Sequence, residues 1–357
     1  MALDLTASSL DITRTICDIP SVSGDEAMLA DAIEQAVRPL AHLEVIRFGN
    51  TIVARTQLGR AQRVVIAGHI DTVPINDNVP TKDVDIDGEP HLWGRGTVDM
   101  KGGVGVQLKL AAELTEPVVD ITWMWYDNEE VAAALNGLNL LSAARPDLFQ
   151  ADFAILGEPS NGQVEGGCNG TLRAIVRTHG MRAHSARAWV GENAIHGAAP
   201  ILARLAEYRA KEVAVEGLVY RESLSAVRIS GGVAGNVIPD LCEVEVNYRF
   251  APSKSAADAE AHVRGVLAGF EVEITDAAEG ARPGLDAPIA QQFVTAVGAE
   301  PRPKYGWTDV ARFSALGIPA VNYGPGDPHL AHHDQERVPT AQIDAVERGL
   351  RAWLTGA

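Results

Sequence analysis

Five side chains that can bind or assist a metal ion follow three apolar, strand-like runs of the sequence. They are His69 and Asp71 after residues 63–67, Glu129 and Glu130 after residues 119–126, and Glu158 after residues 152–156. Imidazole nitrogens and carboxylate oxygens without thiolates suit Zn²⁺, Co²⁺ or Mn²⁺ better than Ca²⁺. In open α/β sheets, ligands bind at the carboxyl ends of the strands, where these residues would meet. The pattern therefore predicts a metal centre at one edge of a sheet.

Two further residues complete this candidate metal centre. Asp99 lies in the glycine-rich segment GRGTVDMKGG, and His332 follows another strand-like run near the C-terminus. Two metal ions about 3.5–4 Å apart require a carboxylate that bridges them, and Asp99 is the candidate for that bridge. His69 and Glu158 would complete one metal site, and Glu130 and His332 the other.

Two carboxylates are left for supporting roles. Asp71 stands two residues after His69 and can accept a hydrogen bond from the second imidazole nitrogen, which would fix the ring. Adjacent residues do not easily face one metal, so Glu129 is free to take a proton from an attacking water while Glu130 binds the ion. Each segment alone would be an ordinary loop, but the coincidence of five such segments favours one functional site.

The elements that must position these residues alternate between strands and helices. The spacing of apolar residues predicts strands at 43–48, 51–56, 63–67, 119–126, 152–156 and 318–323, and helices at 24–38, after the glycine-rich stretch 94–105, near 135–145 and at about 339–354. Such alternation is typical of an α/β domain around a largely parallel sheet.

The middle of the chain follows a different order. From residue 171 the pattern is strand, helix, strand, strand, helix, strand, which is the order of a ferredoxin-like α+β unit. The polar stretch 279–288 then returns the chain to the α/β pattern. We therefore expect a catalytic domain at residues 1–172 and 282–357, with an inserted domain at residues 173–281.

Charge and composition argue against several other classes of protein. The 357 residues carry a formal net charge of −17, whereas sequence-independent nucleic-acid binding needs a basic surface. Three cysteines without a C-x-x-C pair predict neither a disulfide framework nor a thiolate zinc site. The N-terminal segment does not resemble a signal peptide, and no apolar run reaches 18 residues. We expect a cytoplasmic protein that binds neither nucleic acid nor membranes.

The segments that carry this chemistry resemble those of a known family. In chain order they are GHIDTVP (68–74), GRGTVDMKGG (94–103), DNEE (127–130), ILGEPS (155–160), GMRAHSA (180–186) and AHHDQERV (331–338). They resemble the dinuclear-zinc metallopeptidase family of aminoacylases, acetylornithine deacetylases, glutamate carboxypeptidases and succinyl-diaminopimelate desuccinylases. The resemblance covers nearly the whole chain and implies a zinc-peptidase-like catalytic domain with a mostly parallel central sheet.

The resemblance implies the same ligands and the same base as the residue types do. It implies two Zn²⁺ ions per subunit, which Co²⁺ could replace, with Glu129 as the general base. The last histidine of the family pattern stands four residues before a glutamate. This spacing selects His332 over His333, because Glu336 follows His332 at that distance.

The resemblance also concerns the backbone and the subunits. It implies a cis peptide bond between Asp99 and Met100, and a homodimer that forms through the inserted domain. His184 of that domain would reach the site of the other subunit and stabilise an oxyanion there. Without the resemblance, His184 would be an ordinary residue of a surface loop.

The segments between the motifs point to a substrate. GTLRAIV, GGVAGNVIPD and NYRFAP resemble the actinobacterial desuccinylases most, which implies hydrolysis of N-succinyl-LL-2,6-diaminopimelate to succinate and LL-2,6-diaminopimelate for lysine and peptidoglycan precursors. An acidic chain needs local guanidinium groups to bind the carboxylates of this substrate. The candidate residues are Arg249 and Arg312, with Asn236 and Thr308 as hydrogen-bonding partners.

The residues leave alternatives open. Deacylation of N-acetylornithine, or dipeptide hydrolysis, would use the same metal centre, because the residue types do not separate succinyl from acetyl specificity. A non-catalytic metal-binding relative would lack Glu129 or a ligand, and none is missing. A purely structural dimer would bind no stoichiometric metal.

Overall fold

The computed structural model describes residues 3–356, which form two compact units. The first unit contains residues 3–166, 284–302 and 312–356, and the second contains residues 167–283 and 303–311. Among residues 3–356, every helix is too short or too polar to cross a membrane.

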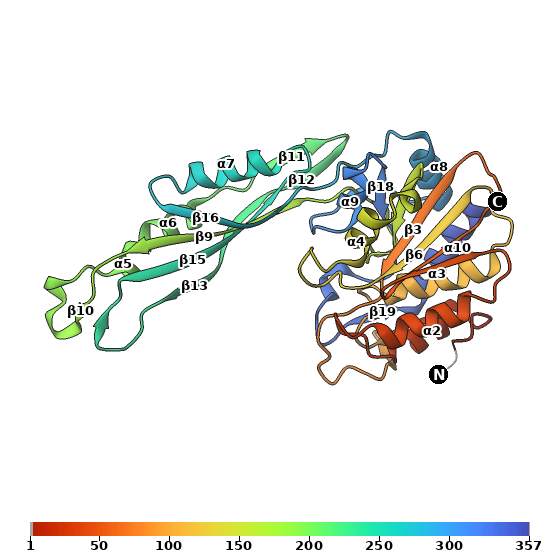
Figure 1. Cartoon of the computed structure of the whole chain (residues 1–357), viewed down its shortest axis with the longest axis horizontal. Helices are drawn as coiled ribbons and strands as arrows, with labels where there is room; N and C mark the ends of the chain where they lie inside the picture. Colours follow the sequence, from red (N-terminus) through yellow and green to blue (C-terminus); the bar gives the residue numbers. More distant parts are fainter. Residues whose placement is uncertain (1–2, 357) are drawn as a thin grey trace. The chain divides into compact units, whose positions relative to one another are not determined.

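The first unit is built around an eight-stranded sheet (Figure 1). Four central strands, in the order β6-β3-β7-β18, run parallel, and the flanking strands β2 and β8 pair antiparallel with them. The strands in sheet order are β1 (Glu44–Phe48), β2 (Thr51–Arg55), β6 (Asp120–Tyr126), β3 (Arg63–His69), β7 (Phe153–Leu156), β18 (Ala320–Asn322), β8 (Glu165–Gly166) and β17 (Arg302–Pro303). The predicted α/β fold with a mostly parallel central sheet is confirmed.

The central strands are buried on both faces, which explains their apolar sequences. Every residue of β6 and of β7 is buried, as is typical of parallel strands that helices cover on both sides. In Figure 1, α3 and α10 run alongside β3 and β6. The helices of this unit and its border are α1 (Ser9–Cys17), α2 (Ala27–Val37), α3 (Lys101–Glu113), α4 (Gly137–Ala144), α8 (Pro288–Val297), α9 (Val310–Ala315) and α10 (Thr340–Thr355).

Glycines let helix α3 closely approach the loop that follows β7 and helix α1. A Cβ atom on Gly103 would lie 2.1 Å from the main-chain oxygen of Gly157, and one on Gly105 would lie 2.1 Å from the Thr13 hydroxyl oxygen. Only glycine fits at either position. The glycine-rich segment therefore brings the start of α3, just after Asp99, against the loop that carries Glu158.

A small three-stranded sheet was absent from the sequence predictions. It consists of β4 (Lys82–Ile86), β5 (Glu89–Trp93) and β19 (Arg337–Pro339), and β5 pairs antiparallel with both neighbours. The segment KDVDIDGEPHLW has no apolar strand pattern, because every residue of β4 remains exposed or half-buried. The pairing of β5 with β19 places the start of the Asp99 segment beside the end of the His332 segment.

The second unit contains a four-stranded antiparallel sheet in the order β13-β15-β9-β16. Figure 1 shows α6 and α7 on one side of this sheet, where their apolar residues pack against the strands. Its elements are β9 (Gly170–His179), β10 (Ala183–His184), η2 (Ser185–Val190), α5 (Ala194–Gly197), α6 (Ala199–Glu207), β11 (Glu212–Val215), β12 (Leu218–Arg221), β13 (Ser223–Gly231), β14 (Val237–Ile238), β15 (Leu241–Phe250), α7 (Ala256–Val266) and β16 (Glu271–Ala278). The main elements follow the β-α-β-β-α-β order of a ferredoxin-like unit.

Two details of the second unit differ from the predictions. The single helix expected after the first strand is divided at Ala198 into α5 and α6, and Pro200 stands in the first turn of α6, where its missing N–H costs nothing. Residues 303–311, expected in the larger domain, pack with the second unit instead. The main-chain N–H of Asn169 donates to the oxygen of Lys304, and the Trp307 indole donates to the oxygen of Glu279.

Asp120, at the start of β6, holds the connection between β2 and β3. Its Oδ1 accepts the Thr56 hydroxyl and the Leu58 N–H, both at 2.8 Å, and its Oδ2 accepts the Arg60 N–H at 2.9 Å. Burial alone would raise the Asp120 pKa, but these hydrogen bonds outweigh it and hold the pKa below its usual value. A carboxylate with a lowered folded-state pKa stabilises the fold above its unfolded-state pKa of about 3.9, and this stabilisation is lost on further acidification.

We therefore expect Asp120→Asn to lower the free energy of unfolding by about 2 kcal/mol at pH 7, since the Arg60 N–H loses a charged acceptor. The difference between parent and variant should shrink as pH falls below about 4. Urea unfolding at pH 7 and pH 3.5 measures both quantities. A difference that does not depend on pH would show that the charge of Asp120 contributes nothing.

Candidate metal centre

Neighbouring parallel strands bring most of the predicted ligands to one edge of the large sheet. His69 is the last residue of β3, Glu129 and Glu130 follow β6, and Glu158 stands two residues beyond β7. Because β6, β3 and β7 are adjacent and parallel, their carboxyl ends lie at the same edge. The fold therefore supplies the convergence that the sequence pattern predicted.

The carboxylate of Asp99 lies between two imidazole rings. Its Oδ1 is 3.1 Å from Nε2 of His69, and its Oδ2 is 3.3 Å from Nε2 of His332. Each oxygen thus faces a different histidine, as a carboxylate that bridges two ions requires. The peptide bond between Asp99 and Met100 is cis, which confirms what the family resemblance implied.

Three clusters of donor atoms are close enough to hold an ion, with the atoms of each cluster within 4.8 Å of one another. They are His69–Asp99–Glu158, Asp99–Glu130–His332 and His69–Glu129–Glu130. The first two share Asp99 and have the composition of two sites joined by one carboxylate. Their nitrogen and oxygen donors fit a transition-metal ion of borderline softness better than Ca²⁺. The assignment of each ligand remains a prediction.

The charges of this cluster favour a bound cation. Burial opposes protonation of His69, but the carboxylates of Asp71 and Asp99 outweigh it and hold the His69 pKa well above its usual value. Hydrogen bonds to Asp99 and Glu130 raise the pKa of His332 to about 10. Burial would raise the Asp99 pKa, yet the two imidazoles lower it below its usual value. A divalent ion can replace the imidazole protons as the positive charge that these carboxylates stabilise.

Asp71 is fully buried and joins two parts of the centre. Its two oxygens accept the main-chain N–H groups of Glu129 and Glu130 at 3.0 and 3.1 Å, and Oδ2 also accepts the Ser23 hydroxyl at 2.7 Å. Nδ1 of His69 lies 3.1 Å from the main-chain oxygen of Asp71 and 3.4 Å from its Oδ1. These contacts hold the imidazole with its Nε2 toward the other ligands.

Sequence reasoning missed Glu26, which supports the loop before Glu129. Its side chain is fully buried, and Oε1 accepts the N–H groups of Gly24 at 2.8 Å and Asn128 at 3.2 Å. Asn128 has a φ of 59°, a left-handed conformation that asparagine tolerates better than most residues. An acidic residue near the start of a helix is a common cap, so its position carried no functional signal.

Two predicted residues lie together on a small ribbon of the second unit. β10, which ends at His184, pairs with β14, and the Ser185 N–H donates to the main-chain oxygen of Asn236 at 2.9 Å. His184 is exposed, and its Nδ1 accepts the N–H of Ala186 at 3.1 Å. The ribbon therefore presents an imidazole to the solvent.

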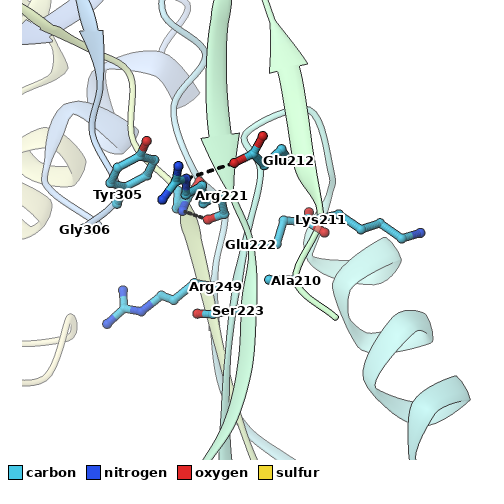
Figure 2. A pocket seen from close by; sticks show the side chains of 10 residues that line it. Ala210, Lys211, Glu212, Arg221, Glu222, Ser223, Arg249, Tyr305 and Gly306 are labelled. Atoms are coloured by element: carbon cyan, nitrogen blue, oxygen red, sulfur yellow. Dashed lines mark hydrogen bonds and ion pairs between the residues drawn. The ribbon is translucent and has the colours of Figure 1, made fainter. Parts of the chain in front are cut away.

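Arg249 lines a pocket of about 770 Å³ within the second unit (Figure 2). Arg221 and Tyr305 line the same pocket, and Figure 2 shows Arg249 and Tyr305 on the same side of the strands. Nε of Arg249 donates to Oδ1 of Asn247 at 3.1 Å, and within residues 3–356 it forms no ion pair with a carboxylate. Burial and the positive charge of Arg173 hold the Arg249 pKa below its usual value. These surroundings favour an anion beside Arg249.

The other predicted substrate-binding residues lie on different elements. Asn236 precedes the ten-residue strand β15 and Arg249 is its second-last residue, so most of the strand lies between them. Thr308 is buried in the second unit, and Arg312 lies on α9 in the first. The four were chosen by residue type, which does not reveal the length of strand between them.

The chain belongs to the family described as peptidase family M20/M25/M40, which matches residues 65–355. A succinyl-diaminopimelate desuccinylase of Corynebacterium glutamicum is 47% identical over 364 residues, covering 99% of this chain and 98% of that protein. A protein of Mycobacterium tuberculosis that provisionally carries the same name is 53% identical over 357 residues, covering 99% of this chain and 100% of that protein. Family and relatives make the chain an amidohydrolase of a metal-dependent family.

Solved structures share this fold. A tripeptidase from Staphylococcus aureus superposes with a TM-score of 0.79 at 19% identity, covering 99% of each chain. A dinuclear metal binding peptidase of the M20 family from Bacillus subtilis superposes with a TM-score of 0.70 at 17% identity, covering 97% of this chain and 96% of that one.

The contacts of Asp71 predict that it supports metal binding. Asp71→Asn places an amide NH₂ against one of the main-chain N–H groups that the carboxylate accepts, so we expect divalent-ion affinity to fall about 10–100-fold. Ser23→Ala removes a single hydrogen bond from the same carboxylate and serves as the matched control, with a smaller loss. Titration of metal-free protein against a competing chelator measures both variants. Parent-like affinity in Asp71→Asn would contradict this role.

Proposed function

We propose that this protein hydrolyses N-succinyl-LL-2,6-diaminopimelate to succinate and LL-2,6-diaminopimelate at a pair of zinc ions. The observation that carries the proposal is the carboxylate of Asp99, because each of its oxygens faces a different histidine. The identities of 53% and 47% to relatives with the desuccinylase name support the choice of substrate. The cytoplasm stays the expected compartment for this reaction.

The proposed centre divides its ligands between two ions. His69 and Glu158 would hold one ion, Glu130 and His332 would hold the other, and Asp99 would be shared between them. Bound zinc would supply Lewis acidity, which lowers the pKa of a water molecule and polarises the scissile carbonyl group. Co²⁺ accepts the same nitrogen and oxygen ligands and is expected to substitute.

Glu129 is the proposed general base. Its main-chain N–H is held by Asp71, and its carboxylate lies in the cluster with His69 and Glu130. From there it can take the proton of the attacking water at a carboxylate oxygen. It would then return this proton to the amine nitrogen as the amide bond breaks, which releases succinate and the free amine.

Arg249 is the proposed partner of a substrate carboxylate. The substrate carries three carboxylates, whereas the chain carries a net charge of −17, so binding needs a cation that no internal carboxylate neutralises. Arg249 meets this condition within the described residues, whereas Arg221 in the same pocket is paired with Glu212 at 3.1 Å. A guanidinium can bind a carboxylate through two parallel hydrogen bonds.

We further propose that the second unit forms a homodimer. Its edge strand β13 pairs with β15 alone among the described strands, and eight of its nine residues are exposed. An unpaired edge can accept a strand from a second copy of the chain. His184 and Asn236, on the ribbon of β10 and β14, would then serve the site of the other subunit, where His184 stabilises the oxyanion.

The substrate proposal predicts selective hydrolysis. Zinc-loaded protein should release succinate from N-succinyl-LL-2,6-diaminopimelate at least tenfold faster than it releases acetate from N-acetylornithine, and a chelator should abolish both rates. Faster hydrolysis of N-acetylornithine would contradict the proposed substrate but would remain consistent with the metal centre. Activity that survives complete metal removal would contradict the metal centre itself.

The base assignment predicts that substitutions of two adjacent glutamates have different effects on turnover and on metal content. Glu129→Gln should lower kcat by about 10²–10⁴-fold and keep both ions, because the amide loses only the basic oxygen. Glu130→Gln, the matched control, should lower metal content as well, because it alters a ligand. Rates and zinc content are measured on the same preparations. Near-normal turnover by zinc-replete Glu129→Gln would refute the assignment of Glu129 as the base.

A further inference from the structure

A buried ion pair lies next to the proposed centre and takes no part in its ligand set. Glu336 is fully buried and Arg95 is 3% exposed, and Nη1 of Arg95 lies 2.8 Å from Oε2 of Glu336. A buried pair of this kind rarely stabilises a fold more than apolar side chains of similar size would. Its position therefore calls for a role other than stability.

The second oxygen of Glu336 contacts the backbone at the bridging residue. Oε1 accepts the main-chain N–H groups of Val98 at 2.9 Å and of Asp99 at 3.0 Å. One carboxylate thus holds two consecutive amides immediately before the Asp99 side chain. The orientation of that side chain depends directly on this backbone.

The same pair also holds the segment that carries His332. The main-chain N–H of Gly94 donates to the oxygen of Glu336 at 3.0 Å, and Nη1 of Arg95 approaches the oxygen of His333 at 3.4 Å. These contacts continue the pairing of β5 with β19, in which Arg337 faces Trp93. These contacts therefore fix the segment of the bridging aspartate and the segment of the last histidine to each other.

We propose that Glu336, held by Arg95, is a positioning residue that sets the Asp99 carboxylate between the two ions. This inference rests on the proposed two-ion centre. The ion held by His69 and Glu158 keeps two ligands anchored next to β3 and β7. The other ion relies on His332, whose side chain is 54% exposed, so it depends more on this clamp.

Two double variants separate positioning from charge. Arg95→Met with Glu336→Gln removes the ion pair but keeps an amide oxygen that can accept the N–H groups of Val98 and Asp99. Arg95→Met with Glu336→Met removes the acceptor as well. Asp120→Asn is the matched control. It replaces another carboxylate that accepts main-chain N–H groups, but Asp120 stands at the start of β6, whereas the proposed centre lies beyond the end of that strand.

The experiment is calorimetric titration of each metal-free protein with Zn²⁺, together with thermal unfolding of the same samples. We expect the Met–Met variant to lose affinity for the weaker ion at least tenfold, the Met–Gln variant to stay within about threefold of the parent, and Asp120→Asn to lose only stability. The single variant Glu336→Asp provides the comparison if the Met–Met protein does not fold: it keeps a carboxylate beside Arg95 but is one methylene shorter, which withdraws the oxygen that accepts the N–H groups of Val98 and Asp99, and we expect a loss of affinity for the weaker ion there too.

Two outcomes distinguish the possible failures. A folded Met–Met variant, or Glu336→Asp in its place, that binds two ions with parent affinity would overturn the positioning role and leave the metal centre intact. A parent protein that binds fewer than two ions would overturn the two-ion centre on which the inference rests.

Discussion

The contact of one carboxylate with two imidazoles is the constraint on which the rest of the centre depends. The two donor clusters that share Asp99 can hold a pair of ions only if this side chain lies within reach of both histidines, and its oxygens lie 3.1 and 3.3 Å from them. The sheet fixes one histidine at the end of β3, whereas the other histidine and Asp99 lie on loops. A carboxylate that bridges ions must be held to within a fraction of an ångström, so those loops need dedicated supports.

These supports are mostly backbone contacts. The close approach of α3 to the Glu158 loop, which only glycine permits at Gly103, fixes the chain just after Asp99. On the other side of the centre, the Asp71 carboxylate holds the amides of Glu129 and Glu130. A carboxylate that accepts main-chain N–H groups positions a loop without using the side chains of that loop, which are then free to bind an ion or move a proton.

The fold and most of the candidate site could be predicted from the sequence because both leave local signals. Buried parallel strands are continuous apolar runs, and polar residues that follow such runs meet at one edge of the sheet, as His69 and Glu158 do. The sheet of β4, β5 and β19 left no such signal, since every residue of β4 is exposed or half-buried. Glu26 has the sequence signature of an ordinary helix cap, and its contact with Asn128 spans 102 positions. Long-range contacts of single polar residues, such as this one, are fixed by tertiary packing alone.

The measurement that tests this account most directly is anomalous X-ray diffraction from crystals of the zinc-loaded protein, recorded on both sides of the zinc absorption edge. We predict two zinc peaks about 3.5–4 Å apart, with one Asp99 oxygen bound to each. His69 and Glu158 should complete the first ion, and Glu130 and His332 the second. A single peak at full zinc loading, or two peaks that do not share Asp99, would contradict the account.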